Sequence, residues 1–482
     1  MSLNSFVTPD GGEMGRAQVL QAQACGLAPS VLMNPVLLKP EADSLSQVIV
    51  QGKVWERQEA KEYFNKKAFV WNVVKSSYEE LVKTYEVIVI EGAGSAAEMN
   101  LRDRDIVNWP VVEMADASVI LVADIDRGGV FAQVIGTMDL LAPEERQRVI
   151  GVVINKFRGD RTLFDDGIEI IEERTGVPVL GVLPYLNDLE LDQEDSVDIE
   201  RFRMTPFGAE TVNVAVVLLP HMSNFTDFNQ LAAESDVALR YVASPKELHG
   251  ADVIILPGSK TTMADLDYLR QAGFEAVLGK QMCQGGEIVG VCGGFQMLGK
   301  EITDPGHVET GGCSKGLGLL DVQTELLPHK TTVQVQARSL NRYGESACQV
   351  EGYEIHMGVT TRGNGVVPCF EIVTDSKTLF PIPGTRETPD LDGAISADGL
   401  VWGTYIHGVF DQPAFRRQWL NRLRIRKSLQ ALDVGTSQAV SERFGHALDR
   451  WADHVESHLT MEPIFSAIGF PGSPPSENLP LD

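Results

Sequence analysis

The chain has 482 residues, roughly twice the usual size of one domain, so we expect two or three domains. Apolar residues make up 43% and charged residues 22%, a composition typical of a globular enzyme and unlike that of fibrous or wholly disordered proteins. The formal charge is −26, from 41 Lys and Arg against 67 Asp and Glu, and such a surface repels nucleic acids and anionic lipids. We therefore expect no nucleic-acid partner, and a local cationic patch wherever an anionic substrate binds.

The start of the chain lacks a basic stretch followed by an apolar one, and no apolar run approaches the roughly 18 residues that a membrane span needs. We therefore expect a soluble, cytoplasmic protein with no membrane partner, and leave its oligomeric state open, a homo-oligomer included. The six cysteines contain no Cys-x-x-Cys pair, which argues against a zinc site or a disulfide framework and for free thiols. We expect no prosthetic group.

Residues 85–184 alternate short apolar runs with helical stretches. The runs are rich in Val and Ile, are followed by polar or Gly-rich residues, and cover residues 87–90, 118–123, 149–154 and 178–183. Buried parallel strands have this pattern, and the loops at their carboxyl ends commonly bind ligands. The pattern predicts an α/β domain built on a parallel sheet.

A second α/β unit is predicted after an acidic, irregular stretch at residues 189–211. Its strands are expected within residues 212–219, 237–242, 252–256 and 287–291, followed by a β-rich portion up to Phe410. Residues 412 to about 459 have a helical pattern, and a Pro- and Ser-rich tail follows. The predicted division is a first domain at 1–195, a linker at 196–211, a second domain at 212–430, and a C-terminal helical segment with a disordered tail at 431–482.

The strongest chemical signal is the sequence Gly290-Val-Cys-Gly-Gly294. An apolar strand runs directly into it and a helical pattern follows, which is the layout of a nucleophile elbow. Glycines on both sides allow the strained turn, and the helix N-terminus favours a thiolate. We interpret Cys292 as a nucleophile. The alternative, a buried structural cysteine in a glycine-containing turn, is disfavoured by this arrangement.

A nucleophilic cysteine needs a base, and His407 lies at the end of the β-like run at residues 402–410. Taken alone, this histidine is better explained as a hydrogen-bonded structural residue. A third element, residues 252–260, ends a strand in a Pro-Gly turn upstream of the cysteine, as an oxyanion-hole loop does.

These three elements, in this order, resemble the glutamine-hydrolysing domain of triad-type glutamine amidotransferases. The larger branch of that group carries a Glu two residues after the His, where this chain has Val409. The resemblance is therefore to the branch that acts on cobyrinic acid derivatives with a Cys–His dyad. It implies that Cys292 attacks the side-chain amide of glutamine, that His407 transfers the protons, and that backbone N–H groups of Gly293 and of the Gly258 turn hold the oxyanion.

The N-terminal half narrows the resemblance to the cobyric acid synthase branch of the cobyrinic and cobyric acid amidotransferase family. The matching motifs extend the likeness over about residues 1–430 and lie at residues 2–18, 33–40, 90–94, 123–131, 155–160 and 223–227. The resemblance implies ATP-driven, glutamine-dependent amidation of the b, d, e and g carboxylates of adenosylcobyrinic acid a,c-diamide, in adenosylcobalamin biosynthesis. The small-molecule partners would be glutamine, ATP and a corrinoid.

The same resemblance implies a dethiobiotin-synthetase-like, P-loop-type sheet in the first domain. Glu91, at the end of its strand, would be a Mg²⁺ ligand and Asn155 a nucleotide-binding residue; an acidic helix cap and an ordinary turn residue are the alternatives. Asp124, Asp126 and Arg127 would bind metal or corrin carboxylates, or would form a salt-bridged loop. The expected cationic patch for the corrinoid comprises Arg127, Lys39, Lys156 and Arg158.

The sequence departs from that fold in one respect, because it contains no Gly-x-x-x-x-Gly-Lys-Ser/Thr phosphate loop. We therefore expect the first strand and the phosphate loop of the family to be missing, the chain to be truncated at its N-terminus, and its binding of ATP to be weak. Two other functions stay open: a cobyrinic acid a,c-diamide synthase, and a non-catalytic corrinoid-binding remnant. An intact Cys292 and His407 argue against the remnant.

Overall fold

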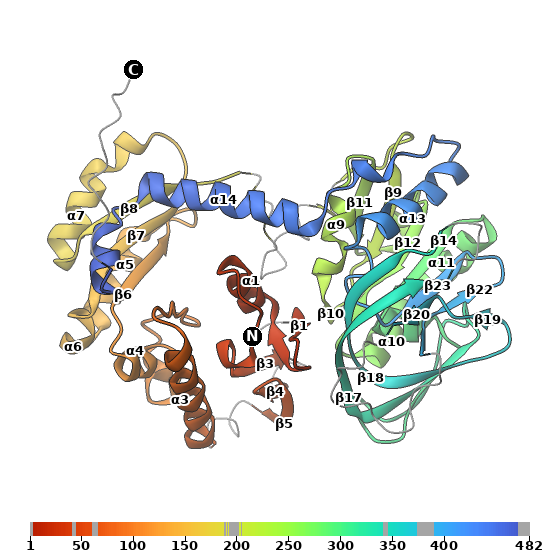
Figure 1. The fold of residues 1–482 in the computed structure, drawn as a ribbon, viewed down its shortest axis with the longest axis horizontal. Coiled ribbons are helices and arrows are strands. Elements are labelled where there is room, and N and C mark those ends of the chain that lie inside the picture. The colour runs from red at the N-terminus through yellow and green to blue at the C-terminus, as the bar shows by residue number, and fades with distance from the viewer. Residues whose placement is uncertain are drawn as a thin grey trace. The chain divides into compact units, whose positions relative to one another are not determined.

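The structure is a computed structural model that describes residues 3–40, 45–59, 66–187, 189, 191, 202–203, 205–340, 346–373 and 390–470. The chain forms two compact units, which Figure 1 shows as ribbons. Unit 1 comprises residues 1–63 and 192–443, and unit 2 comprises residues 64–191 and 444–482. Residues 196–201 and 204 of the predicted linker at 196–211, and the predicted tail from residue 471, lie outside the described residues.

The centre of unit 1 is a seven-stranded sheet whose first five strands are parallel. Every residue of its central strands is buried, as expected for Val- and Ile-rich strands covered on both faces. All four strands predicted between residues 212 and 291 are present. In spatial order the strands are β11 (Val237–Val242), β9 (Val212–Val217), β12 (Val253–Leu256), β14 (Glu287–Val291), β23 (Val401–Thr404), β22 (Ala394–Ser396) and β19 (Val366–Val367).

Helices and short turns follow the strands of this sheet. They are η4 (Phe225–Phe228), α9 (Asn229–Ala232), η5 (Pro245–Leu248), α10 (Thr262–Gln271), α11 (Phe274–Cys283), α12 (Gly293–Leu298), α13 (Pro413–Arg426) and η6 (Val434–Thr436). Two short strands, β10 (Met222–Ser223) and β13 (Gly258–Ser259), pair with each other beside the sheet.

A second sheet of unit 1 is built around one long antiparallel pair, β17 (Val322–Ser339) and β18 (Gln349–Arg362). Its other strands are β16 (Gly312–Lys315), β15 (Glu301–Asp304), β20 (Phe370–Ile372) and β21 (Leu391–Asp392). This sheet is the β-rich portion that the sequence predicts before Phe410.

The N-terminal segment, defined here as the described residues up to 59, also belongs to unit 1. Its strand β1 lies against β17 and β18. Its elements are β1 (Ser5–Val7), β2 (Glu13–Gly15), α1 (Arg16–Ala24), η1 (Val31–Met33), β3 (Val36–Pro40), β4 (Leu45–Val50) and β5 (Lys53–Glu59).

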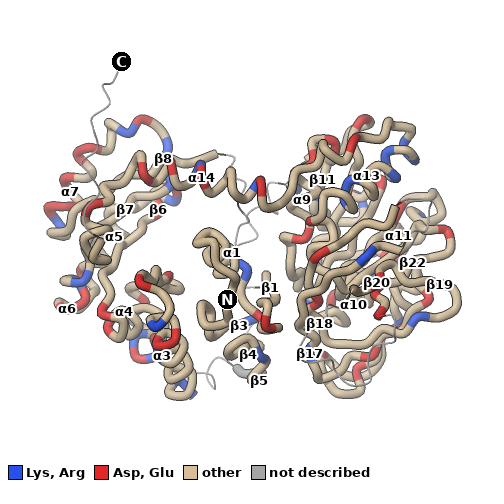
Figure 2. The backbone as a smooth tube through the Cα atoms, viewed as in Figure 1, with Lys and Arg blue, Asp and Glu red and all other residues tan. Residues whose placement is uncertain are grey.

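Helix α13, on which Figure 2 shows a concentration of basic residues, is held by a buried carboxylate. Glu287, at the start of β14, has no exposed surface. Its Oε1 accepts hydrogen bonds of 2.7 Å from the indole nitrogens of Trp402 and Trp419 and from Arg422, and its Oε2 lies 2.6 Å from Arg426. One carboxylate therefore joins the central strand β14 to both β23 and α13.

We expect Glu287→Gln to lower the free energy of unfolding by about 3 kcal/mol, because it removes the buried charge that two arginines share. Chemical denaturation followed by tryptophan fluorescence measures the loss. The matched control is Glu371→Gln, which removes a more exposed pair with Arg338 and should cost less than about 1 kcal/mol. Equal losses in the two variants would contradict the role given to Glu287.

Unit 2 contains the parallel sheet predicted from residues 118–183. Its strands are β6 (Val119–Asp124), β7 (Val149–Phe157) and β8 (Val179–Pro184), in that order. Other elements of this unit are α3 (Lys67–Thr84), η2 (Met99–Arg104), α4 (Trp109–Ala115), α5 (Val130–Leu140), α6 (Pro143–Arg146), η3 (Arg161–Phe164) and α7 (Asp165–Thr175). The buried core of this unit lies between the sheet, α5 and α7.

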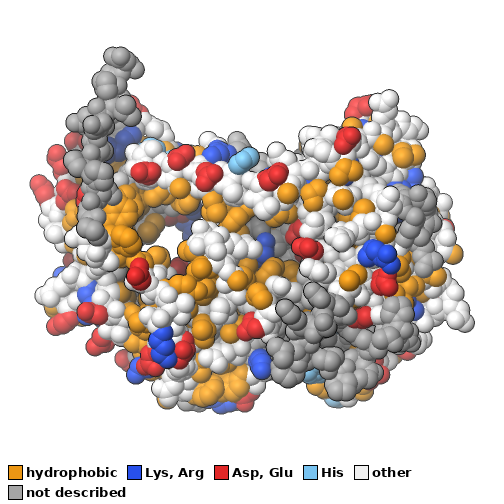
Figure 3. All heavy atoms as spheres, viewed as in Figure 1, with side chains coloured by type: hydrophobic (Ala, Val, Ile, Leu, Met, Phe, Trp, Pro, Cys, Tyr) orange, Lys and Arg blue, Asp and Glu red, His pale blue; other side chains and the backbone are white. Residues whose placement is uncertain are grey.

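The strand predicted at residues 87–90 is wrong for this structure. The segment has no strand assignment, and Val89 is 93% exposed. The reason is that none of the described strands forms a ladder with it, and an extended segment without a partner has nothing to bury its side chains. Hydrophobic side chains also reach the molecular surface elsewhere, as Figure 3 shows for one face.

The predicted C-terminal helical region consists of α13, the turn η6 and two later helices, α14 (Val440–His458) and α15 (Glu462–Ala467). The last part of this region packs on the sheet of unit 2, where Trp451, Leu459 and Ile464 contact a buried cluster. The Thr460 amide also donates a 2.7 Å hydrogen bond to the Leu180 carbonyl. No helix among the described residues is both long and apolar enough to cross a membrane.

Candidate active site

Cys292 lies in a strained turn between β14 and α12, the layout that the sequence predicts. Its φ of 51° is in the left-handed region, which is unusual for a residue other than glycine. The turn packs closely against β12: a Cβ on Gly294 would lie 2.0 Å from the Leu256 carbonyl oxygen. The Cys292 amide donates a 2.8 Å hydrogen bond to the Thr404 carbonyl of β23. The backbone therefore holds the thiol in one place at the end of the central sheet.

His407 follows β23 and is paired with a carboxylate that the sequence analysis missed. Its Nδ1 lies 2.7 Å from Oδ2 of Asp227, and both side chains are buried. The other carboxylate oxygen accepts a 3.1 Å hydrogen bond from the Gly408 amide. Because Nδ1 faces Asp227, the opposite nitrogen, Nε2, is the one free to exchange protons with a reactant.

Asp227 is the last residue of the Ser223–Asp227 motif, so the sequence marked this residue as belonging to a family motif. It did not indicate the pairing with His407, because 180 residues separate the two along the chain. Val409, at the position where the larger branch carries a glutamate, is fully buried in the core. The histidine is thus supported by a carboxylate from η4 rather than from its own strand.

The surroundings of His407 favour its protonated form. Burial by itself lowers the pKa of an imidazole, but the charges of Asp227 and Cys292 and hydrogen bonds to both outweigh it and raise the pKa of His407 to about 10. The Cys292 Sγ also lies 3.7 Å from the Ile355 carbonyl oxygen. The raised pKa favours an imidazolium next to the sulfur of Cys292.

The two expected oxyanion-hole elements lie next to each other. A Cβ on Gly293 would lie 2.9 Å from the Ser259 amide nitrogen, and one on Gly258 would lie 3.3 Å from the His407 ring. Asp265 fixes the turn, because its buried carboxylate lies 2.6 Å from the Ser259 hydroxyl and 2.9 Å from His221 Nδ1. Gly258, Gly293, Cys292 and His407 are therefore brought into one site.

The polar residues predicted in the first domain lie in unit 2, at one edge of its sheet. Asp124, the last residue of β6, is paired with Asn155 of β7. The Lys156 ammonium lies 2.9 Å from Asp124, and the Arg158 guanidinium lies 2.6 Å from Asp126. This is the salt-bridged arrangement that the sequence left open for the two aspartates.

The remaining residues of that prediction are more dispersed. Asn155 Oδ1 accepts a 2.8 Å hydrogen bond from the Lys156 amide, and Glu91 and Arg127 are exposed, with Glu91 outside any strand. Lys39 is wrong as a member of an exposed cationic patch, because it is 4% exposed and its ammonium lies 2.8 Å from Glu13 in unit 1.

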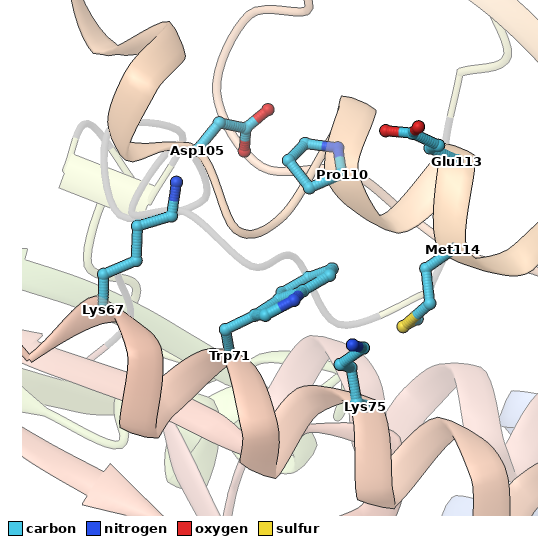
Figure 4. Close-up of a pocket in the computed structure, with 7 residues that line it drawn as sticks. All are labelled: Lys67, Trp71, Lys75, Asp105, Pro110, Glu113 and Met114. Carbon is cyan, nitrogen blue, oxygen red and sulfur yellow. The ribbon is translucent and has the colours of Figure 1, made fainter.

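Unit 2 also has a hollow of about 360 Å³ between α3 and α4, which Figure 4 shows. Its lining combines two lysines and two carboxylates around an indole: Lys67, Trp71, Lys75, Asp105, Pro110, Glu113 and Met114. The opposite charges balance, and Lys67 donates to the Asp103 carbonyl at 2.8 Å. Neither a cysteine nor a histidine is among the residues that line this hollow.

The elbow, the supported histidine and the glycine turn define a glutamine amidotransferase, and comparison with known proteins agrees. Residues 213–415 match the CobB/CobQ-like glutamine amidotransferase domain, and residues 16–193 match an AAA domain. The chain is 47% identical over 472 residues to the cobyric acid synthase of Klebsiella pneumoniae, which covers 97% of this chain and 90% of that protein. It is 46% identical over 471 residues to the cobyric acid synthase of Clostridium botulinum, covering 97% and 92%.

The chain belongs to the cobyric acid synthase family. It is therefore a glutamine-dependent amidoligase with an ATP-using domain, as the sequence motifs predict.

Proposed function

We propose that this chain releases ammonia from glutamine at Cys292 and His407 and uses it, with ATP, to amidate the b, d, e and g carboxylates of adenosylcobyrinic acid a,c-diamide. The observation that carries the ammonia-releasing step is the cysteine in its strained turn beside a histidine held by a buried carboxylate. The corrinoid is inferred from membership of the family and from the motifs in the N-terminal half.

In the proposed reaction the Cys292 thiolate forms a bond to the amide carbon of glutamine. The negative charge on the amide oxygen is held by the Gly293 N–H and an N–H of the Gly258 turn. His407 gives its Nε2 proton to the departing nitrogen, the C–N bond breaks, and ammonia leaves a thioester. The neutral imidazole then takes a proton from water, which attacks the thioester to release glutamate and restore the thiolate.

Unit 2 is the proposed ATP-using half. Asn155 is proposed to contact the nucleotide, Arg127 the corrin carboxylates, and Asp124 and Asp126, which pair with Lys156 and Arg158, a metal ion. Among the described residues no three His, Cys, Asp or Glu side chains gather as a metal site. Mg²⁺ needs only one or two protein carboxylates when phosphates and water supply its other ligands. We therefore propose Glu91 as a protein ligand, and the ion would neutralise phosphate charge. Weak ATP binding by this polypeptide stays a prediction.

Incubation with adenosylcobyrinic acid a,c-diamide, Mg-ATP and glutamine labelled with ¹⁵N in its amide tests the proposed function. Mass spectrometry should find ¹⁵N in newly formed corrinoid amides at the b, d, e and g positions. No labelling of the a,c-diamide, but labelling at the a and c positions when cobyrinic acid is supplied in its place, would favour the a,c-diamide synthase. Binding of the corrinoid with glutamine left intact would favour the non-catalytic alternative.

A further inference from the structure

The N-terminal segment is grouped with different halves of the chain by sequence and by structure. The AAA domain match begins at residue 16 and runs to residue 193, so by sequence most of this segment belongs to the ATP-using half. In the structure, however, residues 1–63 form one compact unit with the glutamine amidotransferase domain. A part of the ATP-using half is thus built into the unit that hydrolyses glutamine.

One face of β17 holds this segment in place. The Lys330 ammonium and that of Lys39 both contact the fully buried carboxylate of Glu13. Two and four residues further along β17, the Thr332 hydroxyl donates 2.8 Å to the Gly11 carbonyl and the Gln334 amide donates 2.9 Å to the Val7 carbonyl. Alternate residues of a strand share a face, so these side chains form one continuous attachment.

The N-terminal end of the segment contacts residues that lie next to His407, the proposed general base. The Ser5 carbonyl accepts a 3.0 Å hydrogen bond from the Tyr353 hydroxyl and a 3.1 Å bond from the Asn224 side-chain amide. The Tyr353 ring is stacked on the His407 ring, with 5.3 Å between their centroids and 19° between their planes. Burial raises the pKa of Tyr353, so its hydroxyl stays neutral and remains a donor.

Asn224 connects the same carbonyl to the other side of the histidine. Asn224 precedes the turn η4 and has a φ of 53°. Its carbonyl accepts a 3.1 Å hydrogen bond from the Asp227 amide. Asp227 then holds Nδ1 of His407. The Ser5 carbonyl is therefore hydrogen-bonded to Tyr353, which stacks on the imidazole of His407. It is also hydrogen-bonded to Asn224, which begins the turn that carries Asp227, the carboxylate partner of His407.

We propose that the N-terminal segment positions the general base of the glutaminase: the Ser5 carbonyl, through Tyr353 and Asn224, aligns His407 for reaction with Cys292. Tyr353 and Asn224 are positioning residues in this proposal, since neither has to touch glutamine. The proposal rests on the proposed function of Cys292 and His407. It makes glutamine hydrolysis depend on docking of a segment that, from residue 16 onward, belongs by sequence to the ATP-using half.

Tyr353→Phe in the full chain tests the proposal, because it keeps the stacked ring and removes only the hydroxyl. We expect the glutaminase kcat to fall about tenfold with little change in KM, as for loss of one buried hydrogen bond. Asn224→Gly should act in the same direction, since glycine accepts the positive φ and lacks the amide. The matched control is Tyr268→Phe, which removes a 3.4 Å bond from a tyrosine to the Ala243 carbonyl elsewhere in unit 1 and should leave kcat unchanged.

Glu13→Gln separates positioning from a local packing effect, because Glu13 contacts the lysines of the attachment and not His407. It should also lower kcat, and the double variant with Tyr353→Phe should lose less than the product of the two single effects, since both act through the same docking. An unchanged kcat in Tyr353→Phe and Asn224→Gly, or independent effects of Glu13 and Tyr353, would overturn the proposal.

Labelling by 6-diazo-5-oxo-norleucine, a glutamine analogue that alkylates the nucleophile, tests the proposed function and the positioning role separately. Wild-type protein that is not labelled at Cys292 would refute the proposed function itself. Wild-type protein that is labelled, with Tyr353→Phe labelled at the same rate, would refute the positioning role alone. Slower labelling of Tyr353→Phe at Cys292 is the expected result.

Discussion

Cys292→Ala is expected to abolish glutamine hydrolysis and glutamine-dependent amidation while ammonia-dependent amidation continues. The alanine leaves the turn in place but removes the atom that bonds to the amide carbon, and loss of a nucleophile costs on the order of 10⁵- to 10⁶-fold in kcat. Added ammonium salt supplies the nitrogen directly and needs neither Cys292 nor His407. Glutamate release and amide formation, assayed separately with each nitrogen source, measure the two activities.

Cys283→Ala is the matched control, because Cys283 is an exposed thiol on α11 of the same unit. It should retain full activity with both nitrogen sources. Equal loss of the glutamine- and ammonia-dependent reactions in Cys292→Ala would mean that Cys292 supports the fold and takes no part in ammonia release.

The parts of this site that are local in sequence could be predicted from the sequence. A run of Val and Ile leading into Gly-Val-Cys-Gly-Gly specifies a strand, a strained turn and a helix within a dozen residues, and the structure has all three. The parallel strands of both units were predictable for the same reason, since each strand is a short run whose burial on two faces leaves a continuous apolar pattern.

The parts that depend on distant contacts could not be predicted. That Asp227 is the carboxylate partner of His407 depends on a contact between residues 180 positions apart, and no local pattern encodes that. Lys39 had the sequence context of a surface cation, yet a buried Glu13 pairs with it. Residues 87–90 have a strand composition, but a strand forms only beside a partner. The attachment of residues 1–63 to unit 1 likewise depends on side chains of β17.

Asp227→Asn, which keeps the size and shape of the side chain, is expected to lower the glutaminase kcat by roughly 10²- to 10³-fold. In serine proteases the equivalent change costs about 10⁴-fold because it stabilises the wrong tautomer of the histidine. A smaller loss is expected here, since a thiol ionises more readily than a hydroxyl and depends less on its base. Asp398→Asn, which alters a carboxylate in the β22–β23 turn, is the control and should keep wild-type kcat.

The pH profile separates this positioning role from simple loss of structure. In the wild-type protein Asp227 and Cys292 raise the pKa of His407 to about 10, so the imidazolium that protonates the departing amide nitrogen persists until the pH rises through that value. Without the Asp227 charge, burial lowers the pKa of His407 with less opposition, and the alkaline limb of kcat/KM should move to lower pH. A variant that unfolds would lose activity at every pH with no shift of the limb. An unshifted limb in a folded Asp227→Asn protein would show that His407 takes its protonation state from Cys292 alone.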